Sequence, residues 1–318
     1  MASEFEIIGR LKKWFPEIGD DAAILRDKRQ ETKDKRQITI VSTDSFVVGE
    51  HFGSYFSPYD MGYKALAASI SDIAACGGIP KYALISIGLK DGDISFVEEF
   101  YTGIKDVAKA YGVKIIGGDT TRSNTVFINA VIIGETKRFI RRNGAQAGDV
   151  ICVTGEIGSS AGGLIALQNK VKNVLTKKHL NPVPRVKEGK ELVNYATSMI
   201  DISDGLLIDL SHILEESKVG ARIWRTKIPI NEGTRKIVKV VASFKPASTS
   251  VEDFAMNGGE DFELLFTIPK DKISEAKKKV DFTEIGEIIQ VASYKSQVTI
   301  IDEKGNKIAV KGFDHFKR

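Results

Sequence analysis

The stretch from Ser57 to Gly78 restricts the fold of this chain more than any other segment. Ser57 followed by Pro58 is typical of a helix start, because a serine hydroxyl caps free N–H groups and proline suits the first helical position. The residues that follow are largely apolar, and we expect the helix to run to about Cys76 and to end at Gly77-Gly78. The sequence therefore predicts a long apolar helix early in the chain.

Asp72 lies well inside this apolar helix, next to Ile70, Ile73 and Ala74. A carboxylate in such surroundings is costly unless it is paired with a cation. An aspartate at a helix start is usually a cap, and one beside glycine is usually part of a turn. Neither explanation suits Asp72, so this position indicates a cation-binding site.

Strand and helix patterns alternate along the chain, and the pattern restarts after Asn143-Gly144. We therefore expect an α/β or α+β protein with two domains, residues 1–143 and 144–318. The polar stretch 27–37 reads as an exposed hairpin tip. The predicted strands are 38–43, 82–89, 113–116, 125–134, 150–154, 199–202, 262–268, 283–289 and 297–302. The predicted helices are 58–76, 95–111, 159–167, 187–196, 204–217 and 271–279.

Composition excludes several classes of protein. The chain has 318 residues and a net charge of +4, but its basic residues lie in short runs without interleaved aromatics, which argues against nucleic-acid binding. With four histidines, a zinc or iron site built on imidazole is not expected. Cys76 and Cys152 lie in apolar surroundings and are interpreted as buried thiols of a cytoplasmic protein. Neither a signal peptide nor a transmembrane helix is predicted.

Aspartate recurs beside glycine, serine or threonine at the edges of apolar runs. Seven aspartates occur in five such segments. Carboxylates combined with hydroxyls, and almost no histidine or cysteine, favour Mg²⁺, which prefers oxygen ligands and shares them with substrate phosphates. The segments are Gly19-Asp20-Asp21-Ala22-Ala23, Ser42-Thr43-Asp44-Ser45, Ser71-Asp72-Ile73, Gly117-Gly118-Asp119-Thr120-Thr121 and Asp201-Ile202-Ser203-Asp204-Gly205.

Two glycine-rich stretches are consistent with a polyphosphate ligand. Gly117-Gly118 follows a predicted strand and allows a phosphate to approach the backbone closely. The loop 155–163 leads from a strand into a helix, and such a helix start suits an anion or is simply a tight turn. Neither stretch is a P-loop, and the protein-kinase motifs are absent. An ATP-dependent enzyme of another lineage is therefore expected.

At this point the motifs resemble those of the thiamine-monophosphate kinase family. That family belongs to the superfamily of aminoimidazole ribonucleotide synthetase and selenide water dikinase. The resemblance covers nearly the whole chain. It rests on the five aspartate segments together with His51-Phe52, Met61-Gly62-Tyr63-Lys64-Ala65-Leu66-Ala67 and Gly258-Gly259-Glu260-Asp261-Phe262-Glu263-Leu264.

The resemblance implies an ATP-dependent kinase that converts thiamine monophosphate to thiamine diphosphate, the last step of thiamine diphosphate synthesis. It also implies an N-terminal domain that binds ATP and several Mg²⁺ ions and dimerises through its sheet, and a C-terminal α/β domain. The implied metal ligands are Asp21, Ser42, Thr43, Asp44, Asp72, Asp119, Asp201 and Asp204. The implied ATP contacts are Tyr101, Gly118, Asp119, Arg142 and Ser203, and the implied substrate contacts are His51, Glu260 and Phe313. The implied catalytic residues are Asp44, Asp119 and Arg142, with Arg138 and Arg141 as alternatives to Arg142.

Three other functions remain open from the sequence. A second enzyme of the superfamily would act on an amide oxygen or on selenide. No cysteine precedes Cys76, as a selenide water dikinase would usually require, and the chain ends in Phe316-Lys317-Arg318 rather than in the cysteine typical of a carbamoyl dehydratase. An idle nucleotide-binding protein would have no use for so many costly carboxylates. A basic nucleic-acid binder is the weakest alternative.

Overall fold

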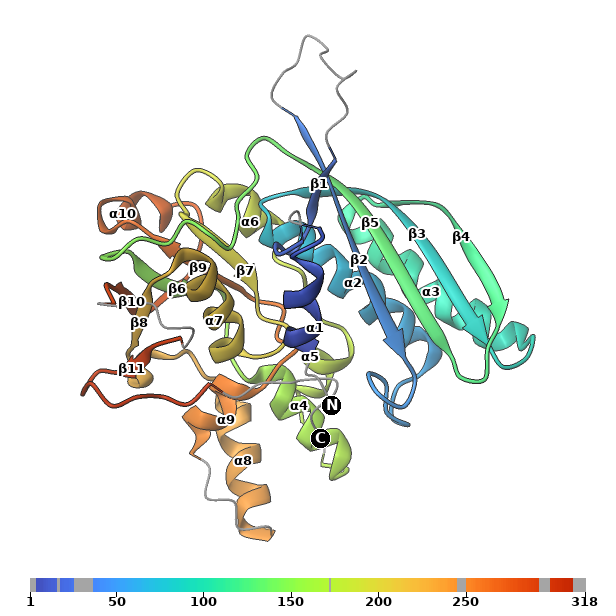
Figure 1. The fold of residues 1–318 in the computed structure, drawn as a ribbon. Coiled ribbons are helices and arrows are strands. Elements are labelled where there is room, and N and C mark those ends of the chain that lie inside the picture. The colour runs from blue at the N-terminus through green and yellow to red at the C-terminus, as the bar shows by residue number, and fades with distance from the viewer. Residues whose placement is uncertain are drawn as a thin grey trace.

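The computed structural model describes residues 4–15, 18–25, 37–171, 173–244, 250–291 and 298–310. Within them the chain forms two sheets that lie side by side, one built by the N-terminal half and one by the C-terminal half (Figure 1). Helix α1 (Glu4–Leu11) precedes the first sheet. Among the helices of the described ranges, none has both the length and the apolar character needed to cross a membrane.

The first sheet has five strands in the order β1-β2-β5-β3-β4. All neighbours are antiparallel except β3 and β4, which are parallel and are joined by a helix. The pairing of β1 with β2 agrees with the predicted hairpin, whose tip lies largely outside the described residues. The strands are β1 (Ala23–Leu25), β2 (Ile38–Val47), β3 (Ile79–Leu89), β4 (Lys114–Arg122) and β5 (Phe127–Thr136).

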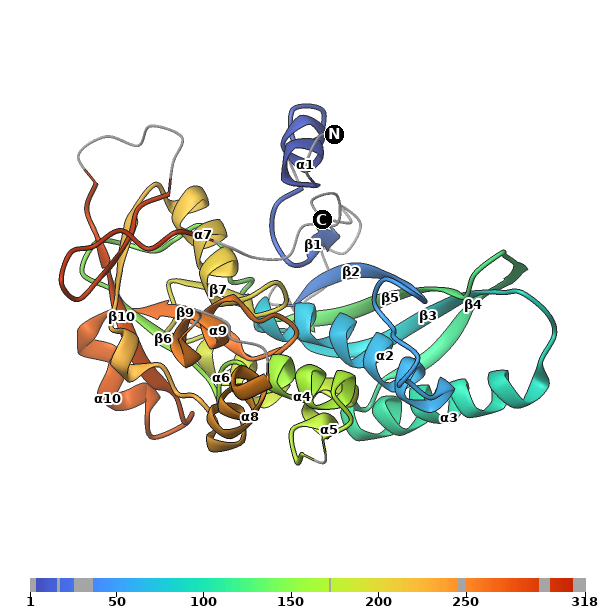
Figure 2. The same ribbon diagram turned by 90° about the horizontal axis from the view of Figure 1, so that it is seen from below.

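Helices α2 (Pro58–Ala75) and α3 (Ile94–Tyr111) cover the same face of this sheet (Figure 2). The start of α2 confirms the prediction, since the Ser57 hydroxyl accepts a hydrogen bond from Asp60 N at 3.1 Å. The two helices approach so closely that a Cβ on Gly62 would lie 2.1 Å from Phe100 O, and one on Gly103 would lie 2.1 Å from Tyr59 O. Backbone therefore packs directly on backbone at this crossing.

The second sheet has six strands in the order β11-β8-β10-β6-β9-β7. Its pairs are antiparallel except β11 with β8. The strands are β6 (Val150–Val153), β7 (Ser198–Asp201), β8 (Gly220–Ile223), β9 (Leu264–Ile268), β10 (Thr283–Ile289) and β11 (Ile300–Asp302). The helices of this half are α4 (Ser159–Gln168), α5 (Thr176–Leu180), α6 (Val186–Leu192), α7 (Leu206–Ser217), α8 (Glu232–Phe244), α9 (Val251–Asn257) and α10 (Ile273–Ala276), with short 3-10 turns η1 (Arg225–Lys227) and η2 (Lys270–Lys272).

Both faces of the second sheet are covered, because alternate residues of its strands point to opposite sides. Ile151 and Val153 of β6 belong to a core shared with α7 and α9. Val150 and Cys152 belong to another core that includes α6, α10 and the end of α2. The C-terminal end of α2 is therefore part of the second half of the molecule, and it joins the two sheets.

Most predicted elements are confirmed, with shifted ends. Strand β4 is longer than the predicted 113–116 and contains Gly117, Gly118 and Asp119 instead of preceding them. Helix α6 is shorter than the predicted 187–196. Helices α5, α8 and α9 and strand β8 were not predicted. Both cysteines are free and buried, as expected. The division at residues 143 and 144 stays a prediction; the first sheet ends at Thr136 and the second begins at Val150.

Candidate metal and phosphate site

Carboxylates from three separate segments meet where the first sheet, α2 and β7 come together. Asp21 precedes β1, Asp72 lies in the last turns of α2, and Asp201 ends β7. One carboxylate oxygen of each lies within 4.8 Å of one oxygen of the other two. The arrangement offers three convergent oxygen ligands, which is the donor type that Mg²⁺ prefers.

Serine hydroxyls orient the carboxylates of this cluster. Ser42 of β2 donates to Asp72 at 2.5 Å, and Ser71 of α2 donates to Asp201 at 2.6 Å. Asp44, two residues after Ser42, faces the same helix and accepts a hydrogen bond from Ser69 at 2.8 Å. A hydroxyl fixes the position of a carboxylate but adds no positive charge.

The cluster contains more negative charge than its surroundings neutralise. Burial raises the pKa of Asp72 well above its usual range, and Asp44, Asp201 and Asp21 raise it further. Burial also raises the pKa of Asp201 to about 8, with Asp21 adding to the effect. Like charges close together in a buried site disfavour ionisation of each other. A bound cation would reverse these shifts, so the acidic cluster fits a metal site.

Arg142 supplies the nearest positive charge of the protein itself. Its Nη2 donates to Asp21 at 2.6 Å, while burial and the Asp20 charge still keep the pKa of Asp21 raised. The two alternative arginines make other contacts. Arg141 pairs with Asp20 at 2.6 Å, and Arg138 donates to Val193 O at 2.8 Å. Of the three arginines, the geometry favours Arg142 for a role at the cluster.

A second group of possible ligands lies at the start of α7. One ligand atom each of Asp204, Asp209 and His212 lies within 4.8 Å of the other two. The Asp209 carboxylate accepts hydrogen bonds from Asp204 N at 3.1 Å and from Gly205 N at 3.0 Å. Asp204 was predicted from the sequence, whereas Asp209 was not, because an acidic residue in a first helical turn is ordinary.

Thr43, Gly118 and Asp119 are not brought to the acidic cluster. Asn129 Nδ2 donates to Thr43 and Ser45 at 2.9 and 3.1 Å, so both hydroxyls lie on the sheet face opposite α2. Ser45 is in register with Asn129, then with Ser86, and finally with Asp119 on β4. Directly paired residues share a face, and three strand spacings amount to about 14 Å. Asp119 therefore lies on the open face, remote from Asp44.

Two further predicted contacts also lie outside the cluster. Tyr101 is on α3, where its ring packs edge-on against Phe100 at 5.2 Å between centroids. Ser203 follows β7, and its carbonyl accepts a hydrogen bond from Glu260 N at 2.7 Å. The predicted substrate contact Phe313 falls outside the described residues.

His51 and Glu260 lie at a second, partly aromatic site, near the N-terminal half of α2. His51 Nδ1 accepts a hydrogen bond from Val47 N at 3.1 Å, and the ring lies 5.6 Å from that of Phe46. The Glu260 carboxylate contacts Lys64 of α2 at 2.8 Å and His179 of α5 at 3.4 Å. Lys64 was not proposed from the sequence. The argument that drew attention to Asp72 applies equally to a lysine inside the same apolar helix.

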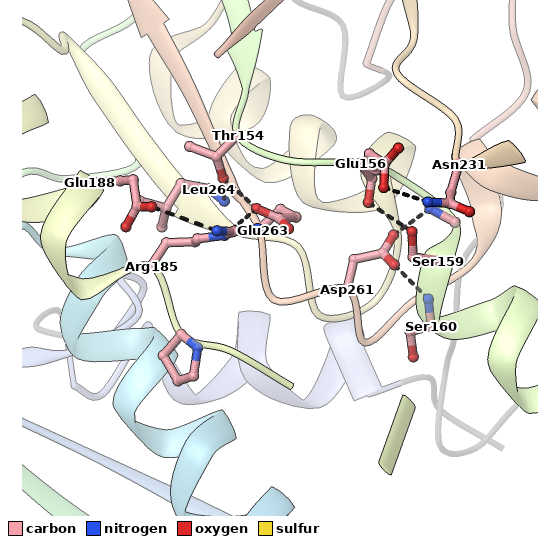
Figure 3. A network of polar contacts seen from close by, with 12 residues as sticks. Thr154, Glu156, Ser159, Ser160, Arg185, Glu188, Asn231, Asp261, Glu263 and Leu264 are labelled. Carbon is pink, nitrogen blue, oxygen red and sulfur yellow. Dashed lines mark hydrogen bonds and ion pairs between the residues drawn. The ribbon is translucent and has the colours of Figure 1, made fainter. Parts of the chain in front are cut away.

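The glycine-rich loop 155–163 does not offer an empty anion site. The start of α4 is capped by the chain's own Asp261, which accepts hydrogen bonds from Gly158 N at 2.6 Å and Ser160 N at 2.9 Å (Figure 3). Burial nevertheless raises the pKa of Asp261 to about 7. The interpretation of this loop as an anion site is therefore wrong, because a carboxylate distant in sequence already takes the place of the anion.

Glu263 belongs to the same polar network, on the far side of the loop (Figure 3). Arg185 Nε donates to one carboxylate oxygen at 2.6 Å, and Arg185 Nη2 pairs with the other. Thr154 Oγ1 donates to Glu263 at 2.7 Å and accepts a hydrogen bond from Leu264 N at 2.8 Å. Glu263 is thus fully provided with partners by the protein.

A cavity of about 560 Å³ lies between α7, α9 and the segment 302–309. Arg225 and Asp253, which form an ion pair at 2.7 Å, are among its lining residues. Of the predicted site residues that the structure describes, none lines this cavity. The convergence of carboxylates, and not the size of a hollow, therefore defines the candidate site.

Comparisons with known proteins agree with this geometry. Residues 19–136 match the family model described as AIR synthase related protein, N-terminal domain, and residues 146–299 match the corresponding C-terminal domain. The chain is 39% identical to thiamine-monophosphate kinase of Buchnera aphidicola subsp. Acyrthosiphon pisum over 99% of both chains. It is 36% identical to the Escherichia coli K12 enzyme, over 94% of this chain and 91% of the other.

A solved structure of AaThiL complexed with AMPPCP and TMP has a TM-score of 0.86 and 32% identity, and covers 99% of this chain and 97% of that chain. Thiamine monophosphate kinase from Aquifex aeolicus gives a TM-score of 0.81 at 30% identity, with 95% and 97% covered. The fold and the paired domains place the chain in the AIR synthase related family. Within it, the chain belongs to the thiamine-monophosphate kinase family.

Proposed function

We propose that this protein transfers the γ-phosphoryl group of ATP to thiamine monophosphate, giving thiamine diphosphate and ADP. The observation that carries the proposal is the convergence of Asp21, Asp72 and Asp201, three oxygen ligands whose negative charge Arg142 compensates only in part. The sequence similarity to thiamine-monophosphate kinases, which extends over nearly the full length of the chain, supports thiamine monophosphate as the substrate. The structure of AaThiL with AMPPCP and TMP supports ATP as the phosphoryl donor.

The chemistry accounts for the charge of the site. The attacking group is a phosphate monoester with a second pKa near 6, so it is largely a dianion at neutral pH and needs no strong general base. The main obstacle is repulsion between this dianion and the triphosphate. Two unit charges about 4 Å apart repel by roughly 4 kcal/mol at an effective dielectric constant of 20, and both partners here carry several charges. Catalysis therefore depends on positioning and on neutralising charge.

We infer that several Mg²⁺ ions supply this neutralisation. Bound Mg²⁺ would neutralise part of the negative charge on the phosphate groups. Asp21, Ser42, Asp44, Asp72 and Asp201 would hold the metal at the cluster, and Asp204 would hold it at the start of α7. Arg142 pairs with Asp21 and would add a fixed positive charge close to the transferred group. Ser203, beside the metal ligands, stays a predicted nucleotide contact, as does Tyr101.

Thr43 and Asp119 lie on the open face of the first sheet, with Gly118 next to Asp119 in β4, and we propose that they act in a homodimer. This face and its edge carry exposed large apolar side chains, including Tyr82 at 44% and Ile116 at 50% exposure. A second copy covering this face would bury them and place ATP in the cleft between the copies. A protein with two free, buried cysteines suits the cytoplasm, where we expect it to act.

The test is direct. Purified protein is incubated with ATP, Mg²⁺ and thiamine monophosphate, and thiamine diphosphate is measured by fluorescence after oxidation to the thiochrome. Product from the monophosphate but not from free thiamine, and its loss with EDTA, is the expected result. ADP without thiamine diphosphate would contradict the proposed substrate. Absence of both from folded protein would contradict the proposed activity.

A further inference from the structure

Lys64 is a lysine enclosed in the molecule. It lies on α2 with 1% of its side chain exposed, and its Nζ pairs with the Glu260 carboxylate at 2.8 Å. Among the described residues, Nζ has no hydrogen-bonding partner besides this carboxylate; its other close contact is the Phe56 ring, 5.1 Å away. Burying an ammonium group is costly. Its position therefore needs a reason beyond the packing of α2.

Glu260 is held in an unusual backbone conformation. Its φ is +63°, in the left-handed region that residues other than glycine rarely adopt, and its N–H donates to Ser203 O at 2.7 Å. Its side chain keeps 33% of its surface exposed although the lysine it contacts is enclosed. One carboxylate oxygen of Glu260 thus pairs with Lys64 and the other contacts His179, while a third of the side-chain surface stays exposed.

The charges around Glu260 keep it an acceptor. Burial alone would raise the pKa of Glu260, but its neighbours, with the charge of Lys64 first among them, outweigh burial and hold it below its usual value. Burial and Lys64 lower the pKa of His179 to about 4, so this ring is neutral near pH 7. Burial also lowers the pKa of Lys64, and the Glu260 carboxylate opposes this lowering, so each charge of the pair depends on the other. An ionised carboxylate accepts hydrogen bonds and donates none.

Lys64 lies on α2 on the N-terminal side of the acidic cluster. It precedes Asp72 by eight residues, which corresponds to about 12 Å along an α-helix. With the phosphate held near the acidic cluster, a thiamine monophosphate lying along α2 would bring its organic part toward Lys64 and Glu260. Thiamine carries a single N–H donor group, the amino group on its pyrimidine ring, and this group suits an acceptor-only carboxylate.

We propose that Lys64 is a positioning residue, which fixes the Glu260 carboxylate so that it accepts a hydrogen bond from the pyrimidine amino group of thiamine monophosphate. The inference rests on the proposed function and extends it to recognition of the ring. The role of Lys64 is exerted through Glu260 and not by contact with the reacting phosphates. His179, which contacts the other carboxylate oxygen, supports the same orientation.

The experiment is a double-mutant cycle of K64M, E260Q and K64M/E260Q, with KM measured separately for each substrate. We expect K64M and E260Q each to raise KM for thiamine monophosphate roughly tenfold or more, as loss of a charged hydrogen bond does, and to leave KM for ATP within about twofold. The double variant should be no worse than E260Q alone, because Lys64 acts through Glu260. Effects that multiply in the double variant, or an unchanged KM in K64M, overturn the proposal.

Oxythiamine monophosphate, in which an oxo group replaces the amino group, provides a measurement that does not depend on the stability of the protein. Wild-type protein should prefer thiamine monophosphate, and K64M and E260Q should lose most of this preference. Retained preference in both variants overturns the assignment of the amino group. Should K64M not fold, K64R provides the same comparison, since it keeps the charge but displaces it. A K64R variant with wild-type KM and preference would support a need for charge only and contradict positioning.

R185M is the matched control, because it breaks another partly buried ion pair, with Glu263, three residues beyond Glu260. It should lower stability without changing KM for thiamine monophosphate. An equal rise of KM in R185M would mean that general damage to this loop explains the effect, and would overturn the proposal. Turnover by wild-type protein tests the proposed function on its own, so a failure at that step is distinct from a failure of the inference.

Discussion

Two sets of carboxylates in the molecule are provided with partners in opposite ways: one set lies where the two sheets meet, and the other lies just before β9. Asp72 and Asp201, of the first set, lie close to another carboxylate, and their pKa values are raised by burial and by neighbouring negative charges. Glu263 is held by Arg185 and Thr154, and Asp261 caps α4. The first set is incomplete without an external cation, whereas the second set is complete within the chain. What distinguishes a binding site from a structural network is whether the chain itself provides partners for the carboxylates, more than the sequence pattern around them.

The largest expected effect is on catalysis at the incomplete set. Asp44→Asn removes a negative charge that faces α2 and would hold the metal, and turnover should fall roughly a thousandfold while the fold is kept. The rate of thiamine diphosphate formation, measured as the thiochrome, gives turnover, and the circular dichroism spectrum shows whether the fold is kept. Asp119→Asn on the open face is the paired variant, and a comparable loss would indicate that the functional site spans both faces. Near wild-type turnover in either variant would remove that residue from the site.

The complete set should respond in stability instead. Arg185→Met leaves Glu263 buried without its ion pair, and the free energy of unfolding in urea should fall by about 3 kcal/mol, with turnover per folded molecule unchanged. Arg222→Met, which breaks a more exposed pair with Glu287, is the control and should cost less than about 1 kcal/mol. Equal losses in the two variants would show that Glu263 is not specially dependent on its partner.

Mg²⁺ should stabilise the protein through the incomplete set alone. At a free concentration about 100 times its Kd, a ligand that binds only the folded state adds about 2.7 kcal/mol to the free energy of unfolding. The melting temperature should therefore be higher in MgCl₂ than in EDTA, both for wild-type protein and for R185M. For Asp72→Asn, the melting temperatures in MgCl₂ and in EDTA should be the same if the cluster is the metal site. A full Mg²⁺ shift in that variant would place the metal elsewhere.

The smallest effect is a change of slope with pH. The pKa of Asp261 is raised to about 7 in the folded protein against a usual value of 3.8, so the folded state holds its proton more tightly. Its contribution to stability is present below pH 4 and is lost as the pH rises through 7. Asp261→Asn should flatten the fall of the unfolding free energy between pH 4 and 7, measured in EDTA. An unchanged slope would mean that this carboxylate is already ionised across that range.

The sequence predicted the architecture well and singled out three aspartates that the fold brings together, because both depend on local signals. Ser57, Pro58 and the Gly77-Gly78 pair mark the ends of α2, and the oddity of Asp72 inside it follows from burial alone. Strand alternation also separates Asp44 from Thr43, since neighbours in a strand face opposite sides. The position of Asp119 relative to Asp44 could not be predicted, because it depends on the order of the strands in the sheet.

Contacts between residues far apart in the sequence could not be predicted from it for the same reason. The loop 155–163 looks like an anion site until Asp261, about a hundred positions later in the chain, is seen to cap it. Lys64 of α2 and His179 of α5 meet at Glu260, which lies between α9 and β9. The spacing of residues along the chain does not indicate such contacts. The cost of a charged side chain inside an apolar helix was the available signal, and it was used for Asp72 but not for Lys64.

The backbone contact between α2 and α3 has a consequence for motion. With Gly62 against Phe100 O and Gly103 against Tyr59 O, neither helix can slide or rotate without a clash. A third contact, Gly189 against Ala74 O, pins α6 to the opposite end of α2. Helix α2 is therefore held at both ends, by α3 near Gly62 and by α6 near Ala74.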